Sequence, residues 1–170
     1  REKNIPLNIR NTNEPDHPGT LITESFVEAP NPERFVTGIA GKCDFSIVTV
    51  SKKGLSGAVG TLRAILEVFE NNSIPVAHTP SGIDCISLAM PTEALTPNQY
   101  SLLDELRSEI RPDSIQINDH IAVIAVVGRK MAFRVGTSGK IFAALGKAGI
   151  NVRMISQGPD EQAIILGVDN

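Results

Sequence analysis

Two glycine-rich loops, each directly before a predicted helix, are the parts of this sequence best suited to do chemistry. Val59-Gly60-Thr61 stands in the first loop, and Val135-Gly136-Thr137 repeats it 76 positions later. A helix N-terminus carries free N–H groups and a partial positive charge of roughly +0.5. Because glycine also allows a close approach of the backbone, such a loop favours a carboxylate or phosphate ligand. The alternative is that both glycines serve only as tight turns.

The acidic and histidine side chains form no catalytic or metal-binding pattern. Asp84 and Asp160 occupy the same turn in the two copies of the repeat, where each could hold an ammonium group or only cap the turn. The histidines lack the spacing of metal ligands; they are His17, His78 and His120. His78 lies beside a predicted turn and could line the same ligand-binding cleft as the first glycine loop. No nucleophile stands beside a base. We therefore predict no catalytic residue and no metal site.

Length, charge and composition narrow the class of protein. The chain has 170 residues, a formal net charge of −3 and only 4% aromatic residues, which argues against nucleic-acid binding. No apolar run approaches the roughly 20 residues of a membrane span, and no signal peptide is recognised, so we expect a cytoplasmic protein. Cys43 and Cys85 are predicted to be buried or partly buried free thiols. Because the chain opens at Arg1, we expect a piece of a longer protein.

The repeat extends well beyond the glycine loops. Matches at the same offset pair Ile65 with Ile141, Ile74 with Ile150 and Val76 with Val152, and the register becomes loose after Asp84 and Asp160. A repeat of this length is too long for a solenoid unit and fits one small domain used twice. Two copies of a small domain favour binding over catalysis.

The hydrophobic pattern predicts the order βαββαβ for the first repeat. The expected elements are a strand over 45–50, a helix from Leu62, strands over 74–78 and 85–90, a helix from Thr96 and a strand over 114–117. Thr96 should cap the second helix, with Pro97 in its first turn. The second repeat should have a strand over 121–127, a helix over 138–148 and strands over 151–156 and 162–168.

The second repeat therefore lacks its last helix and last strand. An unpaired sheet edge invites aggregation, so another segment should cover it. The candidate is a short strand over 35–39, closed by Gly38 and Gly41, which would place the first domain inside the second. Upstream, apolar and polar residues alternate over 5–10, which predicts a half-buried strand, and residues 11–19 are predicted to form a loop.

Three segments resemble a known family. Residues 5–12 (I-P-L-N-I-R-N-T), followed by Pro18-Gly19-Thr20, resemble the linker after the catalytic domain of aspartate kinases. Residues 150–158 (I-N-V-R-M-I-S-Q-G), followed by Glu161, resemble the end of their second ACT domain. Pro80-Ser81-Gly82-Ile83-Asp84 is similar to a turn in the first ACT domain of one bacterial subgroup. The resemblance covers essentially the whole chain.

The resemblance implies an α+β fold of two ferredoxin-like βαββαβ ACT domains, the first inserted into the second. It implies a kinase-domain linker over 1–33, a strand over 34–42 that completes the second ACT domain, the first ACT domain over 43–118, and the second over 119–170 without its C-terminal helix. Such pairs form homodimers and bind an end product of the aspartate pathway, with lysine favoured and threonine next.

In that family, effector binding inhibits an N-terminal kinase domain that converts ATP and L-aspartate to 4-phospho-L-aspartate, for lysine, threonine and methionine biosynthesis. That domain, with its ATP and magnesium, is not in this sequence. The resemblance therefore implies that this chain alone is inactive and needs no cofactor, nucleic acid or membrane.

The resemblance also places the effector beside the first glycine loop and the strand that follows. The implied effector-binding residues are Leu55, Ala58, Gly60, Thr61, Leu62, Val76, Ala77, Ser81, Gly82 and Asp84, and the second-repeat candidates are Gly136, Thr137, Ser138, Asn151, Val152 and Gln157. Lysine-sensitive relatives have an aspartate at the position of Ala77, so Asp84 or backbone carbonyls would hold the ammonium group here. Two alternatives stay open: a regulatory subunit of another amino-acid biosynthetic enzyme, and a ferredoxin-like RNA-binding module.

Overall fold

The structure is a computed structural model that describes residues 5–22, 36–128, 131, 134–158 and 163–170. It divides into two units, residues 1–34 and residues 35–170. The first unit holds an antiparallel hairpin of β1 (Leu7–Ile9) and β2 (Thr20–Ile22), so the strand predicted over 5–10 is confirmed in its centre. Gly19 has a φ of 76°, and a Cβ there would collide with the carbonyl oxygen of Ile9, so this turn requires glycine.

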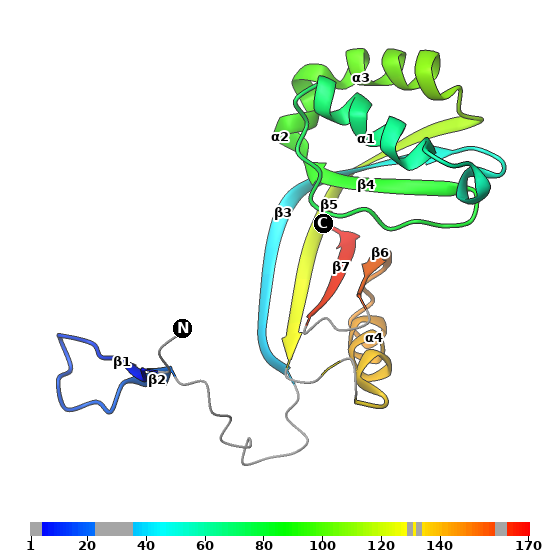
Figure 1. Ribbon diagram of the computed structural model, residues 1–170. Coiled ribbons are helices and arrows are strands. Elements are labelled where there is room, and N and C mark those ends of the chain that lie inside the picture. The colour runs from blue at the N-terminus through cyan, green and yellow to red at the C-terminus, as the bar shows by residue number, and fades with distance from the viewer. Residues whose placement is uncertain (1–4, 23–35, 129–130, 132–133, 159–162) are drawn as a thin grey trace. The chain divides into compact units, whose positions relative to one another are not determined.

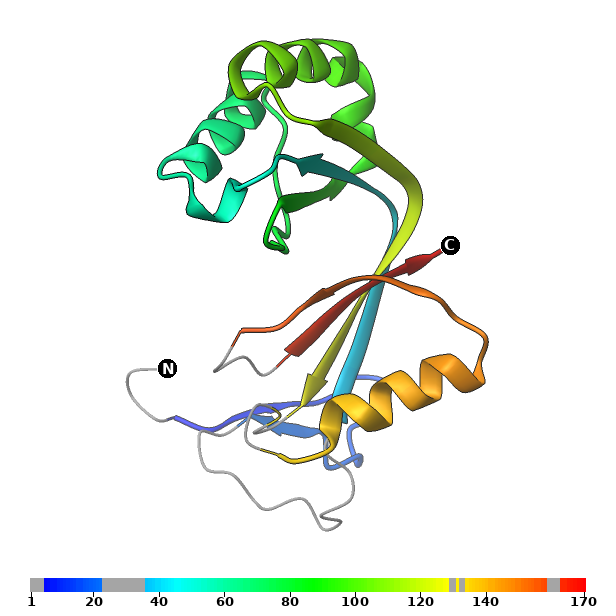
Figure 2. The same cartoon turned by 90° about the vertical axis from the view of Figure 1, so that its right-hand side faces the viewer.

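The second unit is built on one antiparallel sheet with the strand order β4-β3-β5-β7-β6. β3 (Val36–Ser51) and β5 (Ser114–Gly128) are long, curved strands that run through both repeats (Figures 1 and 2). β4 (Cys85–Pro91) extends the sheet in the first repeat, and β7 (Ala163–Asp169) and β6 (Val152–Ser156) extend it in the second. Both repeats therefore share one continuous sheet.

The second repeat takes its missing strand from upstream of the first. The early part of β3 pairs with the late part of β5, where Val36 lies opposite Gly128 and Lys42 opposite Val123. The first domain is thus inserted into the second, as predicted. The prediction that the short strand ends at Gly41 is wrong, because β3 continues to Ser51. The strands predicted separately over 114–117 and 121–127 are two parts of the single strand β5.

The two long strands change course between the repeats. Their pairing shifts register between Lys42 and Phe45, and again between Phe45 and Ile47. Asp44 and His120 have φ values of 63° and 59°, a left-handed conformation that few residues other than glycine, asparagine, aspartate and histidine adopt. The carbonyl of His120 accepts a hydrogen bond from the N–H of Asn170 at 3.0 Å. The bend between the repeats is therefore produced by these register shifts and by the left-handed residues Asp44 and His120.

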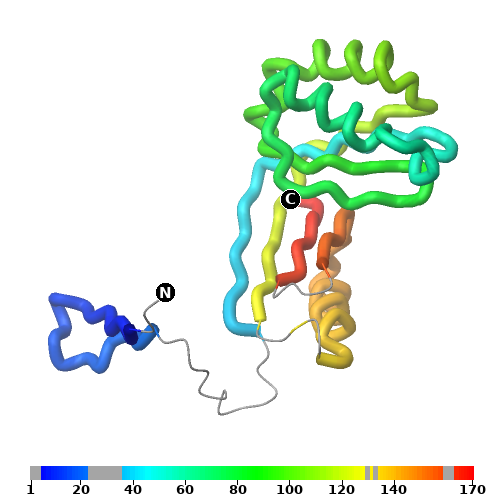
Figure 3. The backbone as a smooth tube through the Cα atoms, in the orientation of Figure 1, coloured from blue at the N-terminus to red at the C-terminus, as the bar shows by residue number. Residues whose placement is uncertain are grey.

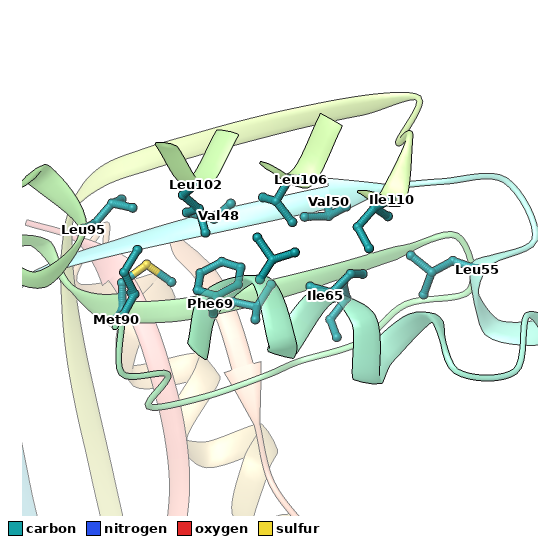
Figure 4. Close-up of a cluster of buried hydrophobic side chains, with 14 residues drawn as sticks. Val48, Val50, Leu55, Ile65, Phe69, Met90, Leu95, Leu102, Leu106 and Ile110 are labelled. Carbon is teal, nitrogen blue, oxygen red and sulfur yellow. The ribbon is translucent and has the colours of Figure 1, made fainter. Parts of the chain in front are cut away.

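The core of the first repeat lies between the sheet and two helical segments. α1 (Thr61–Asn71) buries Ile65, Val68 and Phe69, which recur at helical spacing. Opposite them, α3 (Gln99–Glu105) and the π-helical turn η3 (Leu106–Ile110) bury one apolar face. Figure 4 shows these side chains pointing toward one another over Val48 and Val50. This core positions the start of α1.

The second helical segment begins earlier than predicted. α2 (Thr92–Leu95) precedes the 3₁₀ turn η2 (Thr96–Asn98), which leads into α3. The hydroxyl of Thr96 donates back to the carbonyl of Thr92 at 2.9 Å, so its predicted role as N-cap is wrong. Pro97 is tolerated because it begins a new turn, where its missing N–H is not needed.

The strand predicted over 74–78 is also wrong as a regular element. The backbone returns beside β4 (Figure 3), but it forms only isolated bridges, from His78 to Ala89 and from Ser81 to Ile86. Proline has no N–H to offer a strand ladder, and Pro75 and Pro80 interrupt this segment. An irregular edge of the first-repeat sheet is the result.

The second repeat has a smaller core under one helix, α4 (Thr137–Lys147). Its buried members are Val126, Met131, Ile141, Ile164 and Leu166. Strand pairing also explains the loose register. Val48 lies opposite Leu88, and Ile124 lies opposite Leu166, so the offset grows from 76 in the first strand to 78 in the third. The second copy therefore has two more residues before that strand.

Gly167 lies on β7 where the two repeats meet, and its size is a testable constraint. A Cβ there would lie 3.0 Å from the Cβ of Met154 and 3.3 Å from the Cγ2 of Ile121. We expect Gly167→Val to lower the free energy of unfolding by about 1–3 kcal/mol in urea denaturation, because overpacking strains the core. The control is Gly146→Ala in α4, where an added Cβ meets nothing within 4 Å. It should raise stability by about 0.5 kcal/mol, and wild-type stability in Gly167→Val would contradict the packing described.

Candidate functional site

The two glycine loops have nearly identical backbone geometry. Gly60 and Gly136 are the N-cap residues of α1 and α4, with φ values of 86° and 81°, and no side chain caps either helix. In the first loop, the N–H of Thr61 donates to Ala58 at 3.3 Å and that of Ala64 donates to Gly60 at 3.0 Å. The equivalent bonds of the second loop run from Thr137 to Arg134 at 3.4 Å and from Lys140 to Gly136 at 3.1 Å. The positive φ requires glycine for the turn itself, so the turn alternative holds whether or not a ligand binds.

The first turn of α1 nevertheless offers donors to a ligand. The first helical bond is the one from Ala64 to Gly60, so the N–H groups of Leu62 and Arg63 have no acceptor within the described part of the chain. Sequence reasoning named Leu62 and missed Arg63, although its place as the third residue of the helix was a readable signal. Two adjacent N–H groups at a helix start suit one carboxylate.

Each loop is anchored by one apolar side chain and exposes another. Leu55 and Met131, again 76 positions apart, are only 7% and 2% exposed. Val59 and Val135 are fully exposed. The side chain of Leu55 is therefore part of the core, and only its backbone could contact a ligand. Val59 belongs to the predicted loop but was not among the predicted effector-binding residues, and it provides an apolar surface beside the start of α1.

Asp84 caps the turn beside the first loop. Its Oδ1 accepts a hydrogen bond from the N–H of Gly54 at 2.7 Å, and its carbonyl accepts one from Lys52 at 2.8 Å. The N–H of Ser56 binds the carbonyl of Ile83 at 3.1 Å. The carboxylate thus holds the loop in place, with Oδ2 as its remaining oxygen for a ligand. Asp160, its counterpart, lies outside the described residues.

Val76 and Ala77 lie on the irregular edge. The N–H of Ala77 donates to the carbonyl of Ala89 at 2.8 Å, whereas no hydrogen bond among the described residues uses the backbone of Val76. Val76 also lines an open, mainly apolar groove of about 540 Å³ along the end of α1. The other residues of this groove are Leu66, Phe69, Glu70, Ser73, Ile74 and Pro75. The Val76 carbonyl is therefore a candidate acceptor for an ammonium group.

Ser81 and Gly82 lie elsewhere in the first repeat. Both line a polar cleft on the face of the sheet opposite α1, together with Cys85. The structure thus divides the predicted first-repeat residues between two places. The loop and Asp84 come together through the hydrogen bonds given above, and Ser81 and Gly82 belong to the cleft.

The polar candidates of the second repeat are partly engaged in the fold. The hydroxyl of buried Thr137 donates to the carbonyl of Arg134 at 3.0 Å. The side-chain amide of Asn151 donates to Asp169 at 3.3 Å. Ser138 and Val152 are half-buried, and Gln157 is exposed. The second loop therefore repeats the backbone geometry, but its neighbouring side chains have structural partners.

Within the described ranges, no group of three or more histidine, cysteine, aspartate or glutamate side chains could hold a metal ion. No helix of the described part is both long and apolar enough to cross a membrane.

Comparison with known proteins finds ACT domains and aspartokinases as relatives. Residues 124–170 match the family model of the ACT domain. Aspartokinase 3 of Bacillus subtilis (strain 168) is 30% identical over 165 residues, which covers 96% of this chain and 36% of that protein. Clostridium acetobutylicum aspartate kinase has a TM-score of 0.90 and 39% identity, over 99% of this chain and 39% of that one. The first relative is similar in sequence, and the second is similar in both sequence and fold.

A more distant structure shows the same fold. E. coli aspartokinase III, in complex with lysine and aspartate, has a TM-score of 0.74 at 20% identity, over 99% of this chain and 36% of that one. This chain spans little more than a third of each of these relatives. Its repeated unit, its inserted first domain and these matches have one explanation. Residues 124–170 are an ACT domain, the first repeat is a second copy of the same fold, and the whole chain is similar in sequence and fold to a region of aspartokinases.

Proposed function

We propose that this chain is the amino-acid-sensing regulatory region of a cytoplasmic aspartate kinase. Its effector would be an end product of the aspartate pathway, with lysine favoured and threonine next. The observation that carries the proposal is the uncapped start of α1, held open by Gly60 at a φ of 86°. The lysine complex of E. coli aspartokinase III supports a lysine-like ligand.

The first loop supplies complementary groups for an amino acid. The α-carboxylate would accept hydrogen bonds from the N–H groups of Leu62 and Arg63, aided by the helix dipole. The carbonyl of Val76 would accept from the α-ammonium group. For lysine, the remaining Oδ2 of Asp84 is a carboxylate oxygen that could accept a hydrogen bond from an ammonium group. It would serve in place of the aspartate that lysine-sensitive relatives have at the position of Ala77.

In the whole protein, effector binding would inhibit ATP-dependent phosphorylation of L-aspartate by the kinase domain. A ligand shifts such an equilibrium only by its differential affinity for the two states. A site at a helix start beside an exposed edge suits this role, because subunit contacts there could move with the ligand. We propose that the chain forms a homodimer through its ACT domains, that it has no kinase activity alone, and that it needs no cofactor.

Amide-resolved NMR tests the placement of the effector. On titration with lysine or threonine, the amide signals of Leu62 and Arg63 should shift more than those of other helical residues, because a bound carboxylate polarises the N–H groups it contacts. The signals of Ser138 and Gly139 at the start of α4 report on the second loop in the same titration, because that loop has the same backbone geometry. Shifts confined to α4 would place the effector in the second repeat.

A further inference from the structure

A second cleft, on the helix-free face of the first-repeat sheet, has the features of a separate ligand site. It encloses about 410 Å³, within the usual range of small-molecule pockets. Its floor comes from β3, β4 and β5, and its far wall comes from β6 of the second repeat. The cleft is therefore formed by both repeats within one unit.

One end of this face is closed by packing between the repeats. Met154 of β6 is 4% exposed and packs in a buried cluster with Ile47 and Ala89. Beyond that cluster, the outward residues of the strands become small and polar. The alternation of a strand explains the change, because Val48 and Val50 on the opposite face belong to the helix-covered core. The cleft thus has an apolar end and a polar floor.

The polar floor is made of uncharged hydrogen-bonding groups. The hydroxyls of Thr49 and Ser87, which lie opposite each other in the sheet, are 2.9 Å apart. Beside them, the side-chain amides of Gln116 and Asn118 line the cleft and have no hydrogen-bond partner among the described residues. Hydroxyl and amide groups in one surface suit a ligand with several hydroxyl or carbonyl oxygens.

One cation also lines this cleft. Arg153 is the only charged residue among those that line the described cleft, although the whole chain has a net charge of −3. Its Nε binds Oδ1 of Asp169 at 2.8 Å, and Oδ2 of Asp169 accepts the amide of Asn151 at 3.3 Å. This pairing orients the guanidinium and leaves its two terminal nitrogens as donors. A planar, oriented guanidinium is suited to bind a carboxylate or phosphate.

We propose that this cleft binds a small hydroxylated oxyanion, a hydroxy carboxylate or a sugar phosphate. The oxyanion pairs with Arg153, and the ligand's hydroxyls bind the floor at Gln116 and Asn118. Because the ligand contacts strands of the first repeat and β6 of the second, it holds the two repeats in one orientation across the bend at Asp44 and His120. The proposal requires neither the effector at α1 nor the kinase activity.

The chain contains its own reporter for this test. Cys85 lines the cleft and is half-buried, whereas Cys43 is exposed and is not a cleft residue. A ligand at about ten times its dissociation constant leaves about a tenth of the sites open, so Cys85 should react about tenfold more slowly with iodoacetamide. Peptide mass spectrometry measures both cysteines in the same sample. The probes are L-malate and ribose 5-phosphate, each titrated separately and matched with sodium chloride for ionic strength.

Three variants separate the site from general effects. Arg153→Gln should abolish protection, and Gln116→Leu, which keeps the cation, should weaken it. The matched control is Arg107→Gln, which removes an exposed, ion-paired arginine of η3 and should leave protection unchanged. Thermal unfolding of each variant checks the fold.

The pattern of protection decides the outcome. Protection of Cys85 alone, by malate or by the sugar phosphate, supports the site and identifies the carboxylate or the phosphate as its anion. No protection by either probe, equal protection in Arg153→Gln, or equal slowing of Cys43 overturns the proposal.

Discussion

Replacing Phe69 with alanine is expected to cause a large loss of stability, about 3–5 kcal/mol in the free energy of unfolding. Phe69 is 1% exposed, and it lies in α1 among side chains from the sheet and from α3 (Figure 4). Truncation would leave a cavity that the surrounding helices cannot fill without moving. Urea denaturation followed by circular dichroism measures the change.

The control lies on the same helix. Leu66 is 37% exposed, and Leu66→Ala should cost only about 1–2 kcal/mol, because part of its apolar surface is already in water in the folded chain. Similar losses in the two variants would mean that α1 does not face the sheet as described. A much larger loss in Phe69→Ala than in Leu66→Ala would confirm the orientation of the helix that presents the candidate site.

Leu62→Pro is expected to weaken effector binding by about 10–100-fold, since a hydrogen bond to a charged group is worth about 1.5–3 kcal/mol. Proline removes the N–H that would bind the α-carboxylate. The first turn of a helix tolerates proline, so the fold should persist. The side chain of Leu62 is 47% exposed, and its loss should have little effect on the core.

Leu62→Ala is the matched control, because it removes the same side chain and keeps the N–H. Its affinity for the effector should stay near the wild-type value, and thermal unfolding should confirm that both variants are folded. Equal affinity in Leu62→Pro and Leu62→Ala would remove the start of α1 from the site. Equal weakening in both would assign the effect to the side chain.

The repeated sequence predicted the fold well where local chemistry decides the structure. Three features recur 76 positions later in the structure: the start of the helix, the positive φ of the glycine before it, and the buried apolar residue of the loop. Leu55 and Met131 are that buried residue in the two loops. Each of these features depends on a few neighbouring residues. The unpaired edge of the second repeat also predicted the inserted strand, because an exposed ladder must be covered.

The errors arose where distant contacts decide the structure. β5 continues through Asn118 to His120 because β3 pairs with it on both sides of the bend, and no local pattern shows that pairing. Thr96 has the residue type of an N-cap, but Leu95, which is 1% exposed, anchors an earlier turn in the core. Propensity favoured a cap, and tertiary packing overrode it.

The candidate site was predictable in its backbone and not in its side chains. Gly60 was identified from its type and position, whereas the role of Asp84 in binding the N–H of Gly54 depends on two loops that lie side by side. The cleft at Arg153 was missed for the same reason. Its residues are scattered over four strands and the turn before β4, and only the sheet brings Gln116 and Arg153 together.

Calorimetric titration of this chain with lysine, threonine, methionine and isoleucine, each separately, tests the central claim most directly. We predict saturable binding of lysine or threonine, with one molecule per chain if only the α1 loop binds and two if both loops bind. Binding of methionine or isoleucine alone would contradict the proposed effector. No heat and no saturation with any of the four would contradict the assignment of this chain as a sensor that binds its effector without the kinase domain.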